Sequence, residues 1–574
     1  MMKHTMLRLI SYSKTLKRYV AFSLAGAFVS VAFTLLIPLL TGRAVDYIVG
    51  KDNVDFQNIG KIIGLIAGSL TLSSLFQWVM QFAANKLTYK IALQLRTAAF
   101  NKLNTLPLGY IDTHPHGDIL SRVIVDVEQV SDGLLQAFTQ FFTSVITIAG
   151  TLVLMFTLNV TIALVVVIVT PLSLLVAFFI TRRSLVHFKK QSEDRGRMTA
   201  FIEEMCDGHK TMLAFNKQEY ANDELEKINQ SLYKSGFTSQ LYGALVNPVT
   251  RFVNYLVYVG VGVVGAILAV KSTLTVGELS CFLSYANQYT KPFNEITGVI
   301  SELQSSIAAA NRLFELIDTA DEPDDSDAEA LSHCDGTLVI DNVSFGYTPD
   351  KPLIKNFNLK VEKGQRIAIV GPTGAGKTTI INLLMRFYDV NDGVIYLSGK
   401  PVPSVTRNSL RSCFGMVLQE SWLFEGTYAE NIAYGKPDAT MDEIVSAAKS
   451  AHIHDYIVAQ KDGYDTVIND GISAGQKQLI CIARIMLTLP PMLILDEATS
   501  NIDARTELNI SRAFDRMMKG RTCFIVAHRL STIKEADVIL VMDKGNIIEY
   551  GTHKSLMEKG GFYYNLYNSQ FRQV

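Results

Sequence analysis

The stretch that decides the fold is Arg366-Ile-Ala-Ile-Val-Gly-Pro-Thr-Gly-Ala-Gly-Lys-Thr-Thr379. An apolar strand leads into a glycine-rich loop, and an apolar helix follows, which is the context that a phosphate-binding loop requires. The glycines let backbone N–H groups surround phosphates, and the helix N-terminus adds the positive end of its dipole. The pattern predicts that a nucleotide is bound by the nine residues of the loop: Gly371, Pro372, Thr373, Gly374, Ala375, Gly376, Lys377, Thr378 and Thr379.

Each reactive residue in this region has an expected role. Lys377 would reach the β- and γ-phosphates, and Thr378 would bind magnesium. The apolar strand Leu493-Ile-Leu-Asp-Glu497 ends in two carboxylates. Asp496 would enter the magnesium shell, and Glu497 lies where a base could polarise the attacking water. His528 follows the apolar strand Cys523-Phe-Ile-Val-Ala527, and this position favours contact with the γ-phosphate.

The surrounding sequence has the alternating pattern of strands and helices that is typical of an α/β domain. Short apolar strands such as Leu338-Val-Ile340 and Met492-Leu-Ile-Leu495 alternate with helical stretches, which predicts a mainly parallel sheet. The six cysteines include no Cys-x-x-Cys pair, so neither a disulfide framework nor a zinc site is expected. The net charge of −1 and the pI near 6.8 show no excess of basic residues, so nucleic acid is a disfavoured partner.

The first half of the chain carries a membrane signal. The chain has 574 residues, 48% hydrophobic and only 19% charged, with a mean hydropathy of +0.21. Tyr19–Gly42 and Ile62–Asn85 contain no Asp, Glu, Lys or Arg, and each is long enough for the roughly 20 residues of a membrane span. The uncharged stretch 133–181 predicts two spans that turn near Leu158-Asn159. Two further spans are expected at about 252–270 and 276–300, giving six.

The distribution of Lys and Arg predicts the orientation. Basic residues precede the first span and follow the fourth, whereas the turn at Asn159 has none. The positive-inside rule therefore puts both termini, and with them the α/β domain, in the cytoplasm, for a multi-pass protein of the cytoplasmic membrane.

The expected organisation is a transmembrane domain at 1–317, an acidic and solvated linker at 318–335, and an α/β domain at 336–574. Two polar stretches of the first domain still have apolar residues at helical spacing, so their helices are expected to extend beyond the bilayer. Breaks at Asp112–Gly117 and Phe215–Glu219 suggest short contact helices at the tips of these extensions.

Together these residues resemble the ATP-binding cassette (ABC) exporters, in the half-transporter form that fuses one membrane domain to one nucleotide-binding domain. The resemblance implies a six-helix transmembrane domain, ATP and Mg²⁺ as cofactors, and ATP hydrolysis coupled to transport. Carried across, Tyr347 matches the aromatic residue that stacks on adenine, and Gln419 the glutamine that links magnesium to the membrane domain. Segments around Asp112–Gly117 and Phe215–Tyr220 match the two coupling helices.

The resemblance also implies a dimer, because each ATP site of the family faces the signature loop of another subunit. Here the signature residues are Ser473, Ala474, Gly475 and Gln476, and the loop that crosses the dimer interface contains Ser500 and Asp503. The family signature usually reads Leu-Ser-Gly-Gly-Gln, so Ala474 is a departure. The preceding stretch, Thr466-Val-Ile-Asn-Asp-Gly471, departs as well and is shorter than usual. These departures, and Asn501 where Ala is usual, favour a heterodimer over a homodimer and resemble one subunit of bacterial heterodimeric multidrug exporters.

The expected cargo is a hydrophobic or amphipathic small molecule, such as a drug or a membrane lipid. Lys291 and Glu295 lie one helical turn apart within the sixth span. Charges inside a membrane usually face an interior or water, so the two are either a mutually satisfied pair or part of the substrate path. Two other functions stay open: an ATP-gated regulatory or channel-like protein, and uptake by an exporter-shaped transporter.

Overall fold

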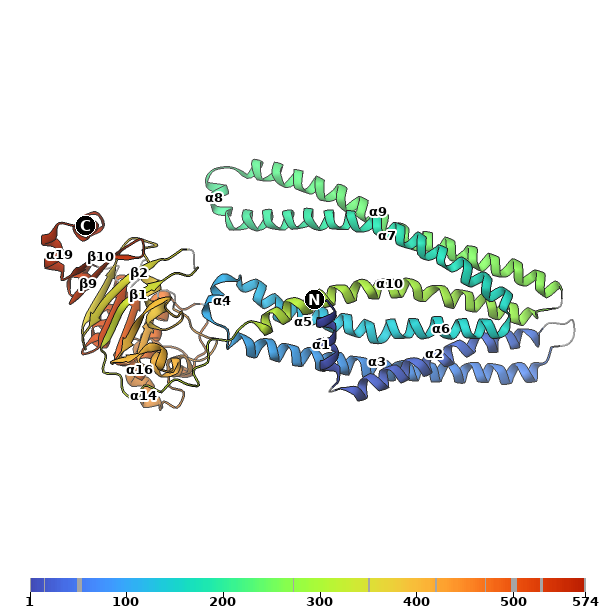
Figure 1. The fold of residues 1–574 in the computed structure, drawn as a ribbon, viewed down its shortest axis with the longest axis horizontal. Helices are drawn as coiled ribbons and strands as arrows, with labels where there is room; N and C mark the ends of the chain where they lie inside the picture. The colour runs from blue at the N-terminus through green and yellow to red at the C-terminus, as the bar shows by residue number, and fades with distance from the viewer. Residues whose placement is uncertain are drawn as a thin grey trace. The chain divides into compact units, whose positions relative to one another are not determined.

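The computed structural model describes residues 2–14, 16–48, 54–271, 273–348, 351–418, 421–469, 471–496, 503–526 and 530–571 (Figure 1). The chain forms two compact units. The first contains Met1–Asn104 and Pro115–Thr319, and the second contains Thr105–His114 and Ala320–Val574.

The first unit is entirely helical in its described residues. Its helices are α1 Met2–Lys14, α2 Lys17–Asp46, α3 Phe56–Leu103, α5 His116–Gln136, α6 Phe142–Leu158, α7 Val160–Asp207, α8 His209–Ala214, α9 Gln218–Val270 and α10 Val276–Asp318. A single π-helical turn, Ala137–Phe141, joins α5 to α6 into one continuous rod. The six long helices predicted from the sequence are therefore present.

The ends of these helices follow from local chemistry. Asn159 adopts an extended conformation, and its side chain accepts from the N–H groups of Thr161 and Ile162, which caps α7. The predicted turn near Leu158-Asn159 is thus confirmed. At the start of α10, Thr275 and Glu278 form a reciprocal capping box.

Several helices are long and apolar enough to cross a membrane. Lys17–Asp46, Phe56–Leu103 and the rod His116–Leu158 satisfy both criteria, with mean hydropathies of 2.3, 1.6 and 2.0 over their most apolar windows. The apolar part of α9 in the described residues, Tyr255–Val270, is shorter.

The two short contact helices lie just before the positions expected from sequence. The first is α4, Leu108–Thr113, and the second is α8, which joins α7 to α9 (Figure 1). The predicted segment Asp112–Gly117 covers the end of α4, a turn and the start of α5, and Phe215–Tyr220 covers the turn after α8 and the start of α9. Pro115 explains the first difference, because a residue before proline avoids helical backbone and α4 must end before it.

Helices α2 and α10 approach each other very closely at one end. Gly42 and Gly277 pack backbone against backbone, so that a Cβ on either would collide with the other's carbonyl oxygen. Beside them, Asp46 accepts from the Gly277 N–H at 2.8 Å and from the Thr275 hydroxyl at 2.9 Å. A carboxylate on α2 therefore caps the N-terminus of α10.

The second unit contains two sheets. The antiparallel sheet has the order β2-β1-β4-β5, and its strands are β1 Leu338–Phe345, β2 Ile354–Val361, β4 Asp392–Leu397 and β5 Lys400–Pro401. The larger sheet has the order β10-β9-β3-β8-β7-β6, and its strands are β3 Arg366–Val370, β6 Phe414–Val417, β7 Met492–Asp496, β8 Thr522–Val526, β9 Val538–Asp543 and β10 Asn546–Gly551. All neighbours in the larger sheet are parallel except β9 and β10.

Helices connect and cover these strands. They are α11 Lys377–Leu384, α12 Arg407–Arg411, α13 Tyr428–Ala433, α14 Met441–Ser450, α15 His454–Val458, α16 Ala474–Thr488, α17 Ala504–Met518, α18 Leu530–Lys534, α19 His553–Lys559 and α20 Phe562–Phe571, with 3₁₀ turns at Val402–Ser404 and Gly463–Asp465. Alternate residues of the larger sheet enter two different cores. Ile367 and Ile369 pack with α11 and the antiparallel sheet, whereas Ala368 and Val370 pack with α16 and α17.

The predicted architecture is confirmed: a helical domain is followed by an α/β domain. The antiparallel sheet β2-β1-β4-β5 is the part that the sequence analysis did not anticipate.

The acidic segment 318–335 is mostly exposed, and several of its carboxylates form ion pairs with the second unit. Arg407, whose side chain is only 6% exposed, pairs with Asp325 at 2.5 Å and with Glu322 at 3.3 Å. Arg411 also pairs with Glu322, at 2.6 Å, and Lys400 pairs with Glu329 at 2.8 Å. Cations of the second unit thus hold this segment along much of its length.

Candidate functional site

The phosphate-binding loop connects β3 to α11, as predicted. Gly374 and Gly376 have φ angles of 80° and 97°, a left-handed conformation that a side chain strongly disfavours. The Ala375 carbonyl accepts from the Gly545 N–H at 3.0 Å, which anchors the loop to the turn between β9 and β10. Glycine is also required at position 371 for steric reasons, because a Cβ there would collide with the Met542 carbonyl oxygen. The loop is therefore shaped by its glycines and its neighbours.

Lys377, the first residue of α11, turns back over this loop. Its Nζ donates to the carbonyl oxygens of Gly371 at 2.8 Å and of Pro372 at 3.0 Å. Burial lowers the pKa of the Lys377 ammonium, and the nearby Asp496 carboxylate partly offsets this effect. The Lys377 ammonium therefore lies within the loop, and the Asp496 carboxylate lies close by.

Asp496 ends β7 at the edge of the sheet where the loop lies. Strands β3 and β7 both pair in parallel with β8, and Asp496 is in register with Val526. With strands about 4.8 Å apart, the carboxyl ends of β3 and β7 lie about 10 Å from each other. The Thr378 hydroxyl belongs to an exposed residue at the start of α11, so two of the three predicted metal ligands, Thr378 and Asp496, lie at this edge.

Tyr347 lies over α11. Its hydroxyl is 3.1 Å from the Thr379 hydroxyl and accepts from the Asn382 amide at 3.3 Å. Its ring meets the Tyr388 ring edge-on, with centroids 5.0 Å apart, and the side chain remains 49% exposed. Tyr347 is therefore an accessible aromatic surface beside the phosphate loop, and stacking on adenine stays a prediction.

Four predicted residues lie outside the described part of the chain: Gln419, Glu497, Ser500 and His528. Three of them follow within two residues of a described segment. β7 ends at Asp496, β8 ends at Val526, and the described residues after β6 stop at Leu418. Their predicted roles stay predictions.

The signature residues form the N-terminus of α16. Ser473 Oγ accepts from the Gln476 N–H at 3.3 Å, and Gln476 Oε1 accepts from the Ser473 N–H at 3.0 Å, which is a complete capping box. These bonds use an acceptor on each side chain. The Ser473 O–H and the Gln476 amide N–H groups keep their donor capacity, which suits an anion. Ala474 is exposed and Gly475 is buried.

Asp503 caps the next helix along the chain. Its carboxylate accepts from the Thr506 N–H at 3.0 Å at the start of α17. This backbone hydrogen bond lowers the pKa of Asp503. The described role is therefore a helix cap, and contact across a dimer interface stays a prediction.

The second unit includes α4, although the helices before and after α4 in sequence belong to the first unit. The Tyr388 hydroxyl donates to Asp112 Oδ2 at 2.6 Å. Gly109, one turn before Asp112, leaves room for the Tyr388 ring, because a Cβ there would lie 3.1 Å from Cε1. Burial, followed by this hydrogen bond, raises the pKa of Tyr388. Sequence reasoning missed Tyr388, since it follows α11 outside any motif.

Lys291 and Glu295 are both exposed on α10, but they do not pair with each other. Glu295 instead accepts from the Ser144 hydroxyl of α6 at 2.9 Å. No ion pair within 4.0 Å is formed between these two described side chains. The interpretation of a mutually satisfied pair is therefore not supported by the geometry, and the substrate-path interpretation stays a prediction.

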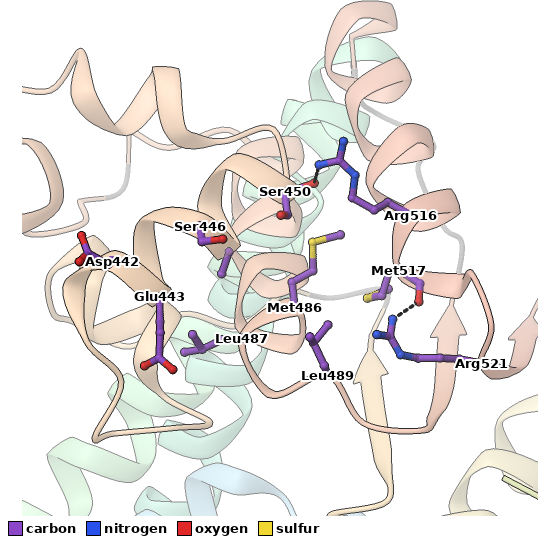
Figure 2. Close-up of a pocket in the computed structure, with 11 residues that line it drawn as sticks. Asp442, Glu443, Ser446, Ser450, Met486, Leu487, Leu489, Arg516, Met517 and Arg521 are labelled. Carbon is purple, nitrogen blue, oxygen red and sulfur yellow. Dashed lines mark hydrogen bonds between the residues drawn. The ribbon is translucent and has the colours of Figure 1, made fainter. Parts of the chain in front are cut away.

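A pocket of about 570 Å³ lies among α14, α16 and α17, away from the loop residues (Figure 2). Its walls include Met486, Leu489 and two arginines. Arg516 donates to the Ser450 carbonyl at 3.5 Å and Arg521 donates to the Met517 carbonyl. No residue predicted to bind nucleotide lines this pocket.

Comparisons with known proteins agree with this arrangement. Residues 20–293 match the family described as the ABC transporter transmembrane region, and residues 354–500 match the family described as ABC transporter. A fatty acid ABC transporter ATP-binding/permease protein of Mycobacterium tuberculosis is 41% identical over 531 residues, 92% of this chain and 84% of that protein. An ATP-dependent lipid A-core flippase of Photorhabdus laumondii is 33% identical over 559 residues, 96% of this chain and 95% of that protein. The solved structure of a bacterial Atm1-family ABC exporter with ATP bound superposes with a TM-score of 0.78 at 28% identity, covering 97% of this chain and 98% of that one.

Proposed function

Because this chain belongs to the ABC exporters, as a half-transporter that couples ATP hydrolysis to transport, we propose that it exports a hydrophobic or amphipathic compound of lipid or multidrug type. The observation that carries the proposal is on α10, where the exposed side chains of Lys291 and Glu295 offer charges of both signs within the predicted sixth span. Charge next to apolar surface suits molecules that have a polar head and an apolar body. The two relatives carry names that refer to a fatty acid and to lipid A core, which are amphipathic.

Vesicle transport tests this function. The purified chain, with its partner where one is needed, is reconstituted in proteoliposomes, and ATP-dependent movement of a labelled fatty acid and of a cationic drug is followed. Glu497→Gln serves as the hydrolysis-deficient control. Movement away from the ATPase side supports export, movement toward it would establish uptake, and an ATP-gated flux without accumulation would establish a channel.

In the proposed ATP site, the loop N–H groups and Lys377 hold the phosphates, Thr378 and Asp496 hold Mg²⁺, and Tyr347 contacts the base. Magnesium bound with a nucleotide takes most of its ligands from phosphate and water, so a few side chains such as Thr378, Asp496 and Gln419 would complete its shell. Gln419 would connect this site to the membrane domain, Glu497 would act as base, and His528 would contact the γ-phosphate.

We propose a heterodimer as the working assembly. The phosphate loop keeps every expected residue, whereas the signature has Ala474 and a short preceding segment. These two faces serve different ATP sites, so a partner with a standard signature would complete the active one. A homodimer is the default for symmetric oligomers. The chain is therefore expressed alone and together with candidate partners, and a lone chain that forms a homodimer with two equally active sites would refute this proposal.

The proposed location is the cytoplasmic membrane, with both termini and the ATPase domain in the cytoplasm. Cys206 is an exposed thiol near the end of α7, next to α8. A membrane-impermeant maleimide should label Cys206 in inside-out vesicles and leave it unlabelled in intact cells. Labelling in intact cells would reverse the orientation.

A further inference from the structure

The pocket among α14, α16 and α17 has an apolar floor (Figure 2). Met486 and Met517 are buried beneath it, and Leu489 lines it while remaining 54% exposed at the end of α16. The pocket volume of about 570 Å³ falls within the range of about 300–1,000 Å³ that is usual for small-molecule sites. The pocket therefore offers apolar surface that a small molecule could cover.

The backbone at Leu489 makes this exposed side chain more notable. Its φ angle is 48°, a left-handed conformation that helix ends usually give to glycine. A leucine at this position is conformationally unfavourable, and in the free chain it also leaves apolar surface in water. An apolar ligand body over Leu489 would remove that surface from water, which is favourable in proportion to the area covered.

Two guanidinium groups line one side of the pocket. Arg516 donates to the Ser450 carbonyl at 3.5 Å, and Arg521 donates to the Met517 carbonyl. In the part of the chain that the structure describes, neither arginine has a carboxylate partner within 4.0 Å. A guanidinium has five N–H donors, so most of the donors on this side remain available. An anionic group could therefore accept hydrogen bonds from both arginines.

The opposite side of the pocket carries negative charge. Figure 2 shows Asp442 and Glu443 across the apolar floor from the two arginines. Lys436 pairs with Glu443 at 2.6 Å and offsets its charge, whereas Asp442 is exposed in the first turn of α14. A second anionic group on a ligand would be repelled by Asp442. The pocket therefore suits a molecule with one anionic group and an apolar body.

We propose that this pocket binds a small monoanionic amphiphile, such as a medium-chain carboxylate. The carboxylate accepts charge-assisted hydrogen bonds from Arg516 and Arg521, which fix its orientation. The apolar chain covers Met486 and Leu489. All the lining residues belong to the second unit, so the site is separate from the substrate path proposed on α10 and does not rest on it.

The test uses the full chain in nanodiscs of zwitterionic phospholipid, with decanoate that carries a terminal diazirine as the labelling reagent. After illumination and digestion, mass spectrometry should find the label on peptides that contain residues 446–450 or 486–489. Unlabelled decanoate should compete with this labelling. Decyltrimethylammonium, with the same chain length and the opposite charge, should compete at least about tenfold less well, because it forms no hydrogen bond with a guanidinium. Decanedioate should also compete less well, because its second carboxylate meets Asp442.

Variants separate the charged contacts from the apolar one. Arg516→Gln and Arg521→Gln should each weaken competition by decanoate by about tenfold, because each removes a hydrogen bond between charged groups. The matched control is Arg512→Gln, an exposed position on α17 that does not line the pocket and should keep the affinity. Leu489→Gly should also weaken binding, while the melting temperature stays the same or rises because glycine accepts the left-handed backbone.

Three results would overturn the inference. The first is labelling confined to peptides outside the pocket. The second is equal competition by decanoate and decyltrimethylammonium, which would show apolar adsorption without recognition of the anion. The third is an equal loss of affinity in Arg512→Gln and Arg516→Gln. Melting temperatures show whether each variant remains folded, and none of these measurements depends on transport, so a failure of the proposed export function would leave them unchanged.

Discussion

Tyr388→Phe should weaken the connection between the ATPase unit and α4 while leaving the nucleotide site intact. The substitution removes only the hydroxyl that donates to Asp112 at 2.6 Å. The ring remains, with its edge-on contacts to Phe345 and Tyr347 at centroid distances of 5.8 and 5.0 Å. A hydrogen bond to a carboxylate contributes about 1.5–3 kcal/mol. Since Asp112 is exposed and water can replace the donor, we expect the lower end, about 1.5 kcal/mol.

If the transport cycle makes this bond in one of its two main states, 1.5 kcal/mol shifts their ratio by about tenfold. Substrate-stimulated ATP turnover in proteoliposomes should therefore fall by up to about tenfold, while basal turnover changes little. Asp112→Asn should act similarly, and the double variant should be no worse than either single one. Tyr550→Phe, at an exposed tyrosine of β10, is the matched control. Unchanged stimulation in Tyr388→Phe, or additive losses in the double variant, would refute the reasoning.

Four further outcomes are expected. Glu497→Gln should keep ATP binding but lower the turnover of ATP by about 10²–10⁴-fold. Lys377→Ala should instead weaken ATP binding itself. Nucleotide titration and turnover assays together distinguish these two effects. Lys291→Gln should reduce the stimulation of ATPase by anionic amphiphiles and Glu295→Gln that by cationic ones, and equal responses would remove both from the substrate path. Asp46→Ala should lower stability by about 1 kcal/mol in thermal melts, because it removes two bonds to the start of α10. The hydrogen bond from Arg8 lowers the pKa of Asp318, so the pair stabilises the folded chain above the unfolded pKa of Asp318. This contribution is lost as the pH falls through the native pKa of Asp318. The difference in melting temperature between wild type and Arg8→Gln should therefore vanish in acid.

The features that sequence predicted best are those set by local chemistry. The phosphate loop lies between β3 and α11 because its glycines and flanking apolar residues allow little else. The break at Asn159 follows from a side chain that caps the helix beginning next to it. In both places the residues that decide the structure are neighbours in the chain.

Features that depend on distant partners escaped prediction. Glu295 has Lys291 one turn away on its own helix, yet its hydrogen bond goes to Ser144 on α6, and no spacing rule identifies a residue on another helix. The acidic segment has the composition of a solvated linker, but Arg407 and Arg411 pair with it from α12. Tyr388 joins α4 through a contact that only the folded chain reveals.

The capping box at Ser473 and Gln476 bears on the life of a newly made subunit before it meets its partner. Without internal hydrogen bonds, the signature loop of an unassembled subunit could fray or adhere to other proteins during that time. Here each side chain already satisfies a backbone N–H of its own helix, and its remaining donors face water at little cost. If these residues contact a partner's nucleotide, as proposed, the loop needs no rearrangement on assembly, and water is exchanged for phosphate oxygens.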